Sequence, residues 1–281
     1  MLNLNQMGNE AYLAIDVGAT KTLLAVFDTS GEMLCEDKLK TDPDYSKLKA
    51  ELAQKTGELA KRYSFSHCAI AMPGTVDLEK GLVLAFGNET WRDVPVKNDL
   101  QAMLPHAKIL FHNDAKLAAL SEAVLLHKKY KKVLYLTIST GIGGGVITDD
   151  VIDKDFENFE PGQMVFEYEG KSQQWEDIAS GRALKARYGK PASEIEDTAV
   201  WQEYVKSLAP GFENLLATIQ PDVVVIGGGV GAHFEKFLTY LLVELKKINN
   251  PLVPVPPLLK AQRPEEAVIY GCYEYIRQNL S

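Results

Sequence analysis

Short apolar segments run into two glycine-rich stretches: Asp16-Val17-Gly18-Ala19-Thr20-Lys21, and later Ser139-Thr140-Gly141-Ile142-Gly143-Gly144-Gly145. A second apolar segment follows each stretch, so the pattern predicts two β-hairpins with the glycines at their turns. Such turns let backbone N–H groups approach phosphate oxygens closely. The consecutive glycines of the second stretch weaken a strand pair, which favours a binding role there. The first stretch is also compatible with a hairpin that needs glycine for its geometry alone.

The rest of the chain reads as strands and helices in alternation, which indicates a mixed α/β sheet with helices on both faces. A chain of 281 residues is long for one compact domain, so we expect two lobes. We place an N-terminal lobe at 1–114, completed by the C-terminal helix 265–281, and a C-terminal lobe at 115–264. The expected strands are 12–16, 22–27, 32–40, 68–72, 108–111, 133–139, 142–148 and 223–226, and the expected helices are 44–63, 115–126, 174–188, 199–208, 211–219, 232–247 and 265–279. Because the hairpin pattern recurs in the second half, an ancient duplication is one interpretation.

Composition and charge restrict the classes of function. The hydrophobic content of 46% and the charged fraction of 24% are ordinary for a soluble globular protein. The net charge of −8 disfavours a nucleic-acid surface, which needs clustered Lys and Arg. We find no secretory signal and no apolar run of membrane-spanning length, so we expect a cytoplasmic protein with no membrane partner. Cys35, Cys68 and Cys272 lie far apart and form no CxxC pair, which indicates neither a disulfide framework nor a thiolate zinc site.

An acidic residue, Asp114, follows Asn113 between the two glycine stretches, where a predicted strand gives way to a helix. Asn and Asp are the preferred helix N-caps, so a purely structural role is one interpretation. The other is catalytic: a carboxylate between two phosphate-binding turns could take the proton of an acceptor hydroxyl that attacks a γ-phosphate in line.

A third glycine run, Gly227-Gly228-Gly229, lies between a strand and a helix and is a further candidate for phosphate or nucleoside binding. It does not fit the GxGxxG pattern, and no acidic residue follows at ribose-binding distance, so a dinucleotide site is disfavoured. A strand-to-helix turn that needs positive φ would explain the same glycines.

Taken in order, DVGATKT, PGTVD, GNETWRDVP, FHNDA, STGIGGG, EPGQ and IGGGV resemble the motifs of the ROK family of sugar kinases and repressors, from about residue 11 to the last helix. The resemblance implies the actin-like, ribonuclease-H-like two-lobed ATPase fold, closing over its substrate, often as a homodimer. It also implies ATP as donor, Mg²⁺ held through water by Asp16, and Asp114 as the catalytic base. By the same resemblance the nucleotide and phosphate ligands are Asp16, Gly18, Thr20, Lys21, Thr140, Gly141, Gly143, Gly144, Gly227, Gly228 and Gly229. The implied sugar ligands are Gly74, Asn88, Asn113, Glu160, Gln163 and Glu176.

The chain departs from the family at Gln163. The family pattern is Glu-x-Gly-His followed by a cysteine-rich loop, whose cysteines and histidine hold one zinc. Here the sequence reads Glu160-Pro161-Gly162-Gln163 and reaches Trp175-Glu176 through a shorter loop without cysteine. Glutamine is a poor zinc ligand and soft thiolates are absent, so we expect no zinc site. Packing of Phe166, Tyr168 and Trp175 is our hypothesis for what supports the loop instead.

These features support an ATP-dependent sugar kinase acting on a hexose or amino-hexose hydroxyl. One alternative is a non-catalytic sugar- or nucleotide-binding regulator of the same fold, although the family's repressors carry an N-terminal helix-turn-helix. Another is a divergent member that phosphorylates a different acceptor, which the missing zinc and Phe159, at a position where the family usually has glycine, favour. The sequence leaves open the sugar and whether ATP or polyphosphate is the donor.

Overall fold

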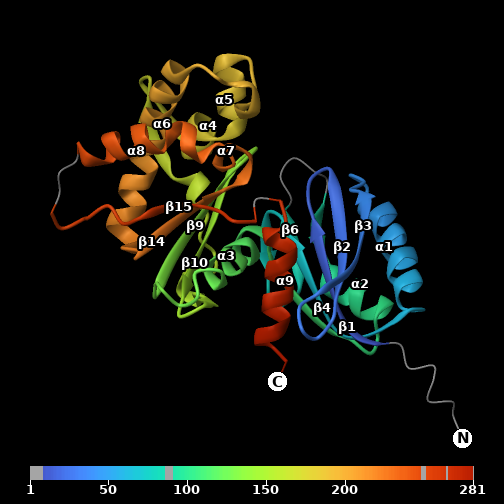
Figure 1. Cartoon of the computed structure of the whole chain (residues 1–281). Helices are drawn as coiled ribbons and strands as arrows, with labels where there is room; N and C mark the ends of the chain where they lie inside the picture. The colour runs from blue at the N-terminus through green and yellow to red at the C-terminus, as the bar shows by residue number, and fades with distance from the viewer. Residues whose placement is uncertain (1–8, 86–90, 248–250, 264, 281) are drawn as a thin grey trace, which may run out of the picture. The chain divides into compact units, whose positions relative to one another are not determined.

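The computed structural model describes residues 9–85, 91–247, 251–263 and 265–280, and the chain forms two compact units. Unit 1 comprises Met1–Ala118 and Val268–Ser281, and unit 2 comprises Ala119–Ala267 (Figure 1). The chain passes from unit 1 to unit 2 within α3 (Asp114–Val124) and returns at the start of α9 (Ala267–Gln278).

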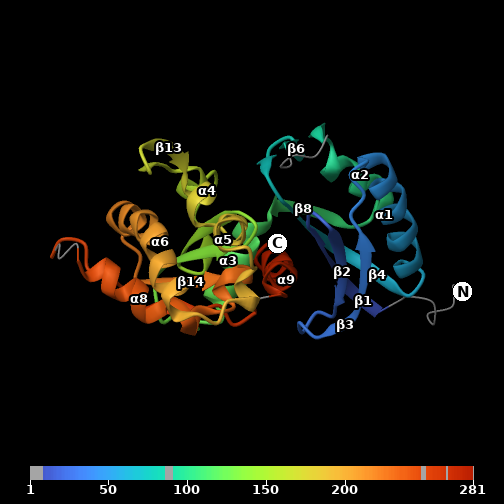
Figure 2. The same cartoon turned by 90° about the horizontal axis from the view of Figure 1, so that it is seen from above.

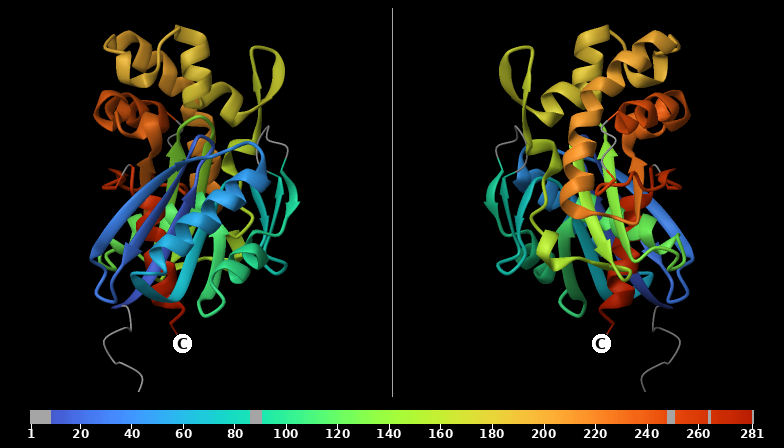
Figure 3. Two further views of the ribbon diagram at one scale, coloured as in Figure 1. Left: turned by 90° about the vertical axis from the view of Figure 1, so that its right-hand side faces the viewer. Right: turned by 90° about the vertical axis from the view of Figure 1, so that its left-hand side faces the viewer.

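Unit 1 is built on a five-stranded mixed sheet of order β3-β2-β1-β4-β8. The strands β1, β2 and β3 form an antiparallel meander, and β4 and β8 add to β1 in parallel. Helices α1 and α2 cover one face of this sheet and α9 covers the other (Figures 2 and 3). The bounds are β1 Asn9–Val17, β2 Lys21–Phe27, β3 Met33–Lys40, α1 Tyr45–Leu59, β4 Tyr63–Met72, α2 Val96–Met103 and β8 Lys108–Asn113.

Alternation along the strands of unit 1 explains the two covered faces, because successive side chains point to opposite sides of a sheet. Leu13 and Ile15 of β1 belong to a core that includes Leu48 and Leu52 of α1. Tyr12, on the other face, lies 6.3 Å from the ring of Tyr273 on α9. The sheet is therefore buried on both sides.

Unit 2 repeats this topology with the order β11-β10-β9-β14-β15. An antiparallel meander of β9, β10 and β11 is again extended by two parallel strands, β14 and β15. Apolar residues of α6 and α8 pack against β9 and β14 in one core. The bounds are β9 Lys132–Ile138, β10 Ile142–Thr148, β11 Val151–Ile152, α4 Trp175–Ala179, α5 Gly181–Tyr188, α6 Thr198–Ile219, β14 Val223–Gly227, α7 Gly228–Gly231, α8 Phe234–Lys246 and β15 Leu258–Lys260.

Several elements differ from the expectation. The helix expected at 174–188 is two helices, because Ser180 is extended and caps α5 by accepting the amide of Ala183 at 3.2 Å. The helices expected at 199–208 and 211–219 are one helix, α6, with Pro210 inside it. Buried side chains on both sides of Pro210, among them Leu208 and Phe212, hold the helix together despite the lost hydrogen bond.

The sequence analysis did not predict several short strands and one short helix. They are the small sheet of β5 (Thr75–Asp77), β6 (Leu82–Ala85) and β7 (Arg92–Val94), helix α2, and the hairpin of β12 (Val165–Tyr168) and β13 (Lys171–Gln174). Within the described part of the chain, no helix is long and apolar enough to cross a membrane. All three cysteines are free thiols, and Cys68 and Cys272 are buried.

Two helical glycines in opposite surroundings give a prediction about stability. A Cβ on Gly211 of α6 would lie 2.0 Å from the ring of Trp175, whereas a Cβ on Gly57 of α1 would meet no atom within 4 Å. Gly57→Ala should therefore stabilise the protein by about 0.5–1 kcal/mol through helix propensity. Gly211→Ala should destabilise it by about 1–3 kcal/mol through overpacking. Thermal unfolding of both variants checks this, and a Gly211→Ala protein as stable as wild type would contradict the packing.

Candidate active site

Three parallel strands of unit 1 end at one edge of its sheet and gather the expected residues there. In the register, Asp16 of β1 is opposite Ala71 of β4, and Ala71 is opposite His112 of β8. Because parallel strands share a direction, their carboxyl ends meet at the same edge. Asp16, Gly74 and the Asn113-Asp114 pair, which are far apart in sequence, therefore lie at one edge.

The carboxylates of Asp16 and Asp114 interact at this edge. Burial, and to a smaller degree the negative charge of Asp114, raises the pKa of Asp16 to about 7, although the charge of Lys21 acts in the opposite direction. Desolvation and a like charge both disfavour the ionised form of a carboxyl group. A cation placed here would reverse that preference.

The first glycine turn is closed by one backbone bond, in which the N–H of Gly18 donates to the carbonyl of Lys21 at 2.9 Å. The side chains of Thr20 and Lys21 are exposed on this turn. Thr41, which the sequence analysis missed, is hydrogen-bonded to this turn. Its N–H donates to the Thr20 carbonyl at 3.1 Å, and its hydroxyl lies 2.8 Å from that of Thr22.

Asn113 acts as the helix cap that was one interpretation of the sequence. Its Oδ1 accepts the amides of Ala115 at 2.9 Å and Lys116 at 3.3 Å, and its Nδ2 donates to the carbonyl of Gly74 at 3.0 Å. Gly74 has φ +80°, which favours glycine. Because an amide nitrogen carries two hydrogens, Asn113 keeps one donor for a ligand. Asp114 is half-buried in the first turn of α3.

Two buried polar side chains flank this pair and were not anticipated. His112 is 3% exposed and Lys116 is 1% exposed. Burial lowers the pKa of His112 to about 4, with a smaller contribution from the charge of Lys116. The neutral ring accepts the amide of Asn113 on Nδ1 at 2.9 Å, which fixes the backbone just before Asp114.

The GNETWRDVP motif contains both an expected sugar ligand, Asn88, and Trp91. Asn88, an expected sugar ligand, lies outside the described residues. Trp91 is 2% exposed, and its Nε1 donates to the carbonyl of Pro43 at 2.7 Å. Its ring packs on Tyr45 at 5.4 Å, so Trp91 has a packing role.

In unit 2 the second glycine turn adjoins the start of α5. The N–H of Gly181 donates to the carbonyl of Ser139 at 2.6 Å, and Thr140 is exposed at the tip. A Cβ on Gly144 would lie 2.7 Å from the carbonyl of Tyr135 and 3.1 Å from the ring of Phe159. The close carbonyl of Tyr135, together with the ring of Phe159, is therefore a structural reason for this glycine.

The third run lies at the same edge of the unit 2 sheet, because Gly227 of β14 is opposite Thr137 of β9. Gly228 has φ +81°, and a Cβ there would lie 2.6 Å from the carbonyl of Ile138. A Cβ on Gly227 would lie 2.5 Å from the hydroxyl of Tyr135, whereas one on Gly229 would meet no atom within 4 Å. Gly229 is exposed, and the space beside its backbone is open.

The expected acceptor residues of unit 2 are partly brought together. Gln163 donates through Nε2 to Oε1 of Glu176 at 3.3 Å, and Glu160 is exposed just before them. Trp175 is fully buried, and Phe166 and Tyr168 are half-buried against the same core. The three rings are not exposed, as the hypothesis about loop support requires.

The residues present fit a hydrated magnesium ion better than a protein-caged metal. Within the described residues, no three His, Cys, Asp or Glu side chains are grouped to hold a metal. Magnesium keeps several waters and binds through one or two carboxylates together with phosphate oxygens. The raised pKa of Asp16 beside Asp114 marks a place where such a charge would be stabilised.

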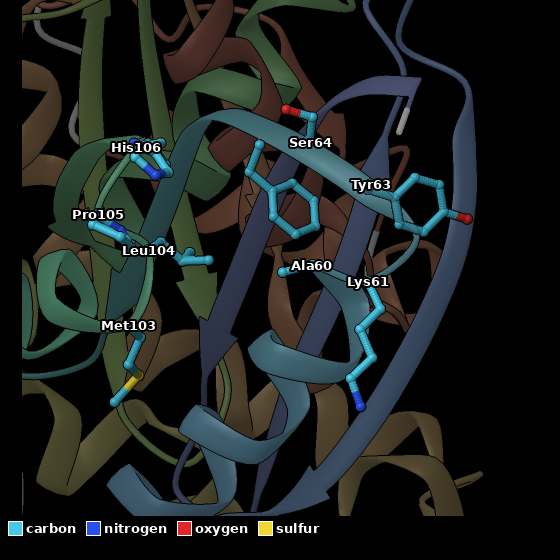
Figure 4. Close-up of a pocket in the computed structure, with 10 residues that line it drawn as sticks. Ala60, Lys61, Tyr63, Ser64, Met103, Leu104, Pro105 and His106 are labelled. Carbon is cyan, nitrogen blue, oxygen red and sulfur yellow. The ribbon is translucent and has the colours of Figure 1, made fainter. Parts of the chain in front are cut away.

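A cavity of about 410 Å³ in unit 1 is separate from these residues (Figure 4). Its lining comes from residues 60–61, 63–65 and 103–107, at the amino ends of β4 and β8. The candidate residues lie at the carboxyl ends of the same strands, so this cavity takes no part in the site.

Comparison with known proteins places these features in context. The chain matches the ROK family over residues 12–278. The N-acetyl-D-glucosamine kinase of Escherichia fergusonii is 27% identical over 296 residues, which cover 92% of this chain and 97% of that protein. This relative is named as a kinase.

Solved structures agree with the fold. A ROK family glucokinase from Streptomyces griseus, in complex with glucose and AMPPNP, has a TM-score of 0.77 at 22% identity and covers 95% of this chain and 99% of its own. A ROK family transcriptional regulator, a homologue of the E. coli MLC protein, has a TM-score of 0.82 at 18% identity, covering 97% of this chain and 78% of its own. The expected actin-like α/β ATPase fold is confirmed.

The pKa of Asp16 predicts a pH-dependent cost to stability. In the unfolded chain the pKa is near 3.8, and in the folded protein it is about 7. Between these values the folded state keeps a proton that the unfolded state has lost, so stability falls as pH rises through this window. Asp16→Asn should therefore be more stable than wild type by about 1–3 kcal/mol at pH 8, with a smaller difference at pH 5.

Asp28→Asn is the matched control, because hydrogen bonds from Ser30 and Glu32 lower the pKa of Asp28. The effect of the substitution on stability is then opposite, so Asp28→Asn should be less stable than wild type at pH 8. Denaturant unfolding at both pH values measures the differences. An Asp16→Asn variant no more stable than wild type at pH 8 would contradict the burial and repulsion.

Proposed function

The chain belongs to the ROK family, and on that basis we propose that it transfers the γ-phosphoryl group of ATP to a hydroxyl of a hexose or amino-hexose. The observation that carries this proposal is the pair Asp16 and Asp114 at one sheet edge, with the pKa of Asp16 raised by burial and by Asp114. A carboxylate base and a carboxylate for a hydrated cation are the groups that phosphoryl transfer to an alcohol needs.

In this proposal Asp114 is the general base. Its carboxylate takes the proton of the acceptor hydroxyl as that oxygen forms a bond to the γ-phosphorus and the bond to the bridging oxygen of ADP breaks. Asn113 and Gly74 place the acceptor, since Asn113 retains one amide hydrogen beside the Gly74 carbonyl. Mg²⁺, bound through water at Asp16, would neutralise charge on the phosphates.

Residues of unit 2 supply the nucleotide and further acceptor contacts in the proposal. The exposed Thr140 and the open backbone at Gly229 offer donors to phosphate or adenosine. Glu160, Gln163 and Glu176 contribute to the acceptor side. Gly143 and Gly144 lie in β10 next to the second glycine turn, and Gly227 and Gly228 join β14 to α7. Homodimer formation, a cytoplasmic location and the absence of nucleic-acid binding stay predictions from the sequence.

The role of Asp114 is tested by Asp114→Asn. Loss of a general base should lower kcat by about 10²–10⁴-fold while ATP binding persists. A coupled assay of ADP release over hexoses, amino sugars and non-sugar alcohols measures turnover, and calorimetry measures ATP binding. Turnover near that of wild type would rule out the assignment.

The same screen separates the alternatives. A regulator would bind a sugar without releasing ADP, and a divergent kinase would release ADP only with a non-sugar alcohol. The fold likeness to a transcriptional regulator is the observation that keeps the first alternative in view. Replacing ATP by polyphosphate in the screen identifies the donor.

Gly229 and Gly228 provide a matched pair for the nucleotide site. Gly229→Ala adds a methyl group to open space, so it should leave thermal stability within about 0.5 kcal/mol of wild type while raising the KM for ATP. Gly228→Ala puts a Cβ at φ +81° and 2.6 Å from a carbonyl, so it should destabilise by about 1–3 kcal/mol. A Gly229→Ala enzyme with unchanged KM for ATP would place the nucleotide elsewhere.

A further inference from the structure

Four polar groups of unit 2 form a continuous chain of hydrogen bonds from the β12–β13 hairpin to the second glycine turn. Nε2 of Gln174 donates to Oε1 of Gln163 at 2.6 Å. Nε2 of Gln163 donates to Oε1 of Glu176 at 3.3 Å. Oε2 of Glu176 accepts the backbone N–H of Ile142 at 3.3 Å, directly after the turn. Of these side chains, Gln174 has no role in the function proposed above.

The polarity of this chain allows one arrangement only. An ionised carboxylate accepts hydrogen bonds and cannot donate them, so Gln163 must turn its NH₂ toward Glu176. Its carbonyl oxygen then points away and needs a donor. Gln174 supplies that donor. If the Gln163 amide flipped, its oxygen would face the oxygen of Glu176, and like dipoles and charge would repel.

The backbone fixes the ends of the chain. Gln174 and Glu176 flank Trp175, which is fully buried. The backbone N–H of Trp175 donates to the carbonyl of Met164 at 2.7 Å. This bond ties the strand-to-helix junction to the residue that follows Gln163. The two glutamines are therefore held next to each other by a buried anchor.

The glycines around Glu176 leave room for its carboxylate. A Cβ on Gly141 would lie 2.6 Å from Oε2 of Glu176, and a Cβ on Gly162 would lie 3.0 Å from the same atom. Glu176 thus rests against the backbone of the turn that carries Thr140. Displacement of this carboxylate would therefore change contacts both at Gly162 and Gln163 and at the turn.

We propose that Gln174 is a positioning residue, which orients the amide of Gln163 and thereby holds the Glu176 carboxylate on the second glycine turn. The proposal rests on the proposed function for its effect on the acceptor. Through side chains of unit 2, this chain of hydrogen bonds links Gln163 to the second glycine turn, residues 139–141. Gln174 acts through Gln163 and needs no contact with the substrate.

A double-mutant cycle tests this route of action. Gln174→Ala and Gln163→Ala should each raise the KM for the acceptor sugar about 5–10-fold, the effect of one lost hydrogen bond, with a smaller effect on kcat. The double variant should match Gln163→Ala alone, because the two side chains act in series. Gln174→Glu should be worse than Gln174→Ala, since it replaces the donor by an acceptor. Additive effects, or an unchanged KM in Gln174→Ala, would overturn the proposal.

The matched control is Gln173→Ala, the neighbour on β13, whose Nε2 donates to the carbonyl of Tyr168 within the hairpin at 3.1 Å. This variant should keep the wild-type KM. If it raises KM as much as Gln174→Ala does, hairpin stability explains the effect and the proposal fails.

A readout without turnover separates this proposal from the proposed function. Amide hydrogen exchange at Ile142, followed by NMR, should be about 5–10-fold faster in Gln174→Ala and Gln163→Ala and unchanged in Gln173→Ala. If wild type releases no ADP with any sugar, the proposed function fails while the exchange rates still test the chain. Unchanged exchange at Ile142 in Gln174→Ala would overturn the proposal whatever the activity.

Discussion

The burial of Asp16 beside the carboxylate of Asp114 is the constraint on which the site in unit 1 depends. The positions of both side chains are fixed by the sheet, because the register of three parallel strands brings the strand ends to one edge. Burial and the like charge hold the pKa of Asp16 near 7, so the ionised pair opposes folding at neutral pH. Lys21 offsets part of this effect. Keeping two such carboxylates together lowers the stability of the fold, and pKa values perturbed in this way are concentrated at functional sites.

The same topology explains how distant glycine runs meet in unit 2. Both sheets begin with an antiparallel meander and add two parallel strands beside its first strand. The turn after that first strand therefore lies at the edge where the parallel strands end. In unit 1 this edge holds the turn 18–20 beside Asp114, and in unit 2 it holds 139–141 beside Gly227 and Gly228. The equal strand order in both units supports the interpretation of an ancient duplication.

Long, strongly patterned elements could be predicted from the sequence, and short or context-dependent ones could not. The two hairpins and the strand 223–226 were expected because their apolar runs are bounded by glycine. Strands such as β5 and β7, of three residues each, carry too little pattern to be recognised. The helices expected at 199–208 and 211–219 are one helix, α6, because tertiary packing overrides the effect of Pro210. Gly144 was interpreted as a ligand contact, whereas the close carbonyl of Tyr135 and the ring of Phe159 also favour glycine there, and such contacts between elements leave no local signal.

In residues 160–176 of unit 2, hydrogen bonds between side chains set the orientation of two amides. A metal ion fixes its ligands through its own charge and coordination geometry. Gln163 and Gln174 offer no such centre, and amides attract soft or borderline cations weakly. What they have is polarity: each amide donates at one end and accepts at the other, so the charge of Glu176 fixes the orientation of both. Packing of Trp175 supplies the position and hydrogen bonding supplies the orientation. The geometry of residues 160–176 therefore depends on the carboxylate of Glu176 and on the amide donors of Gln163 and Gln174.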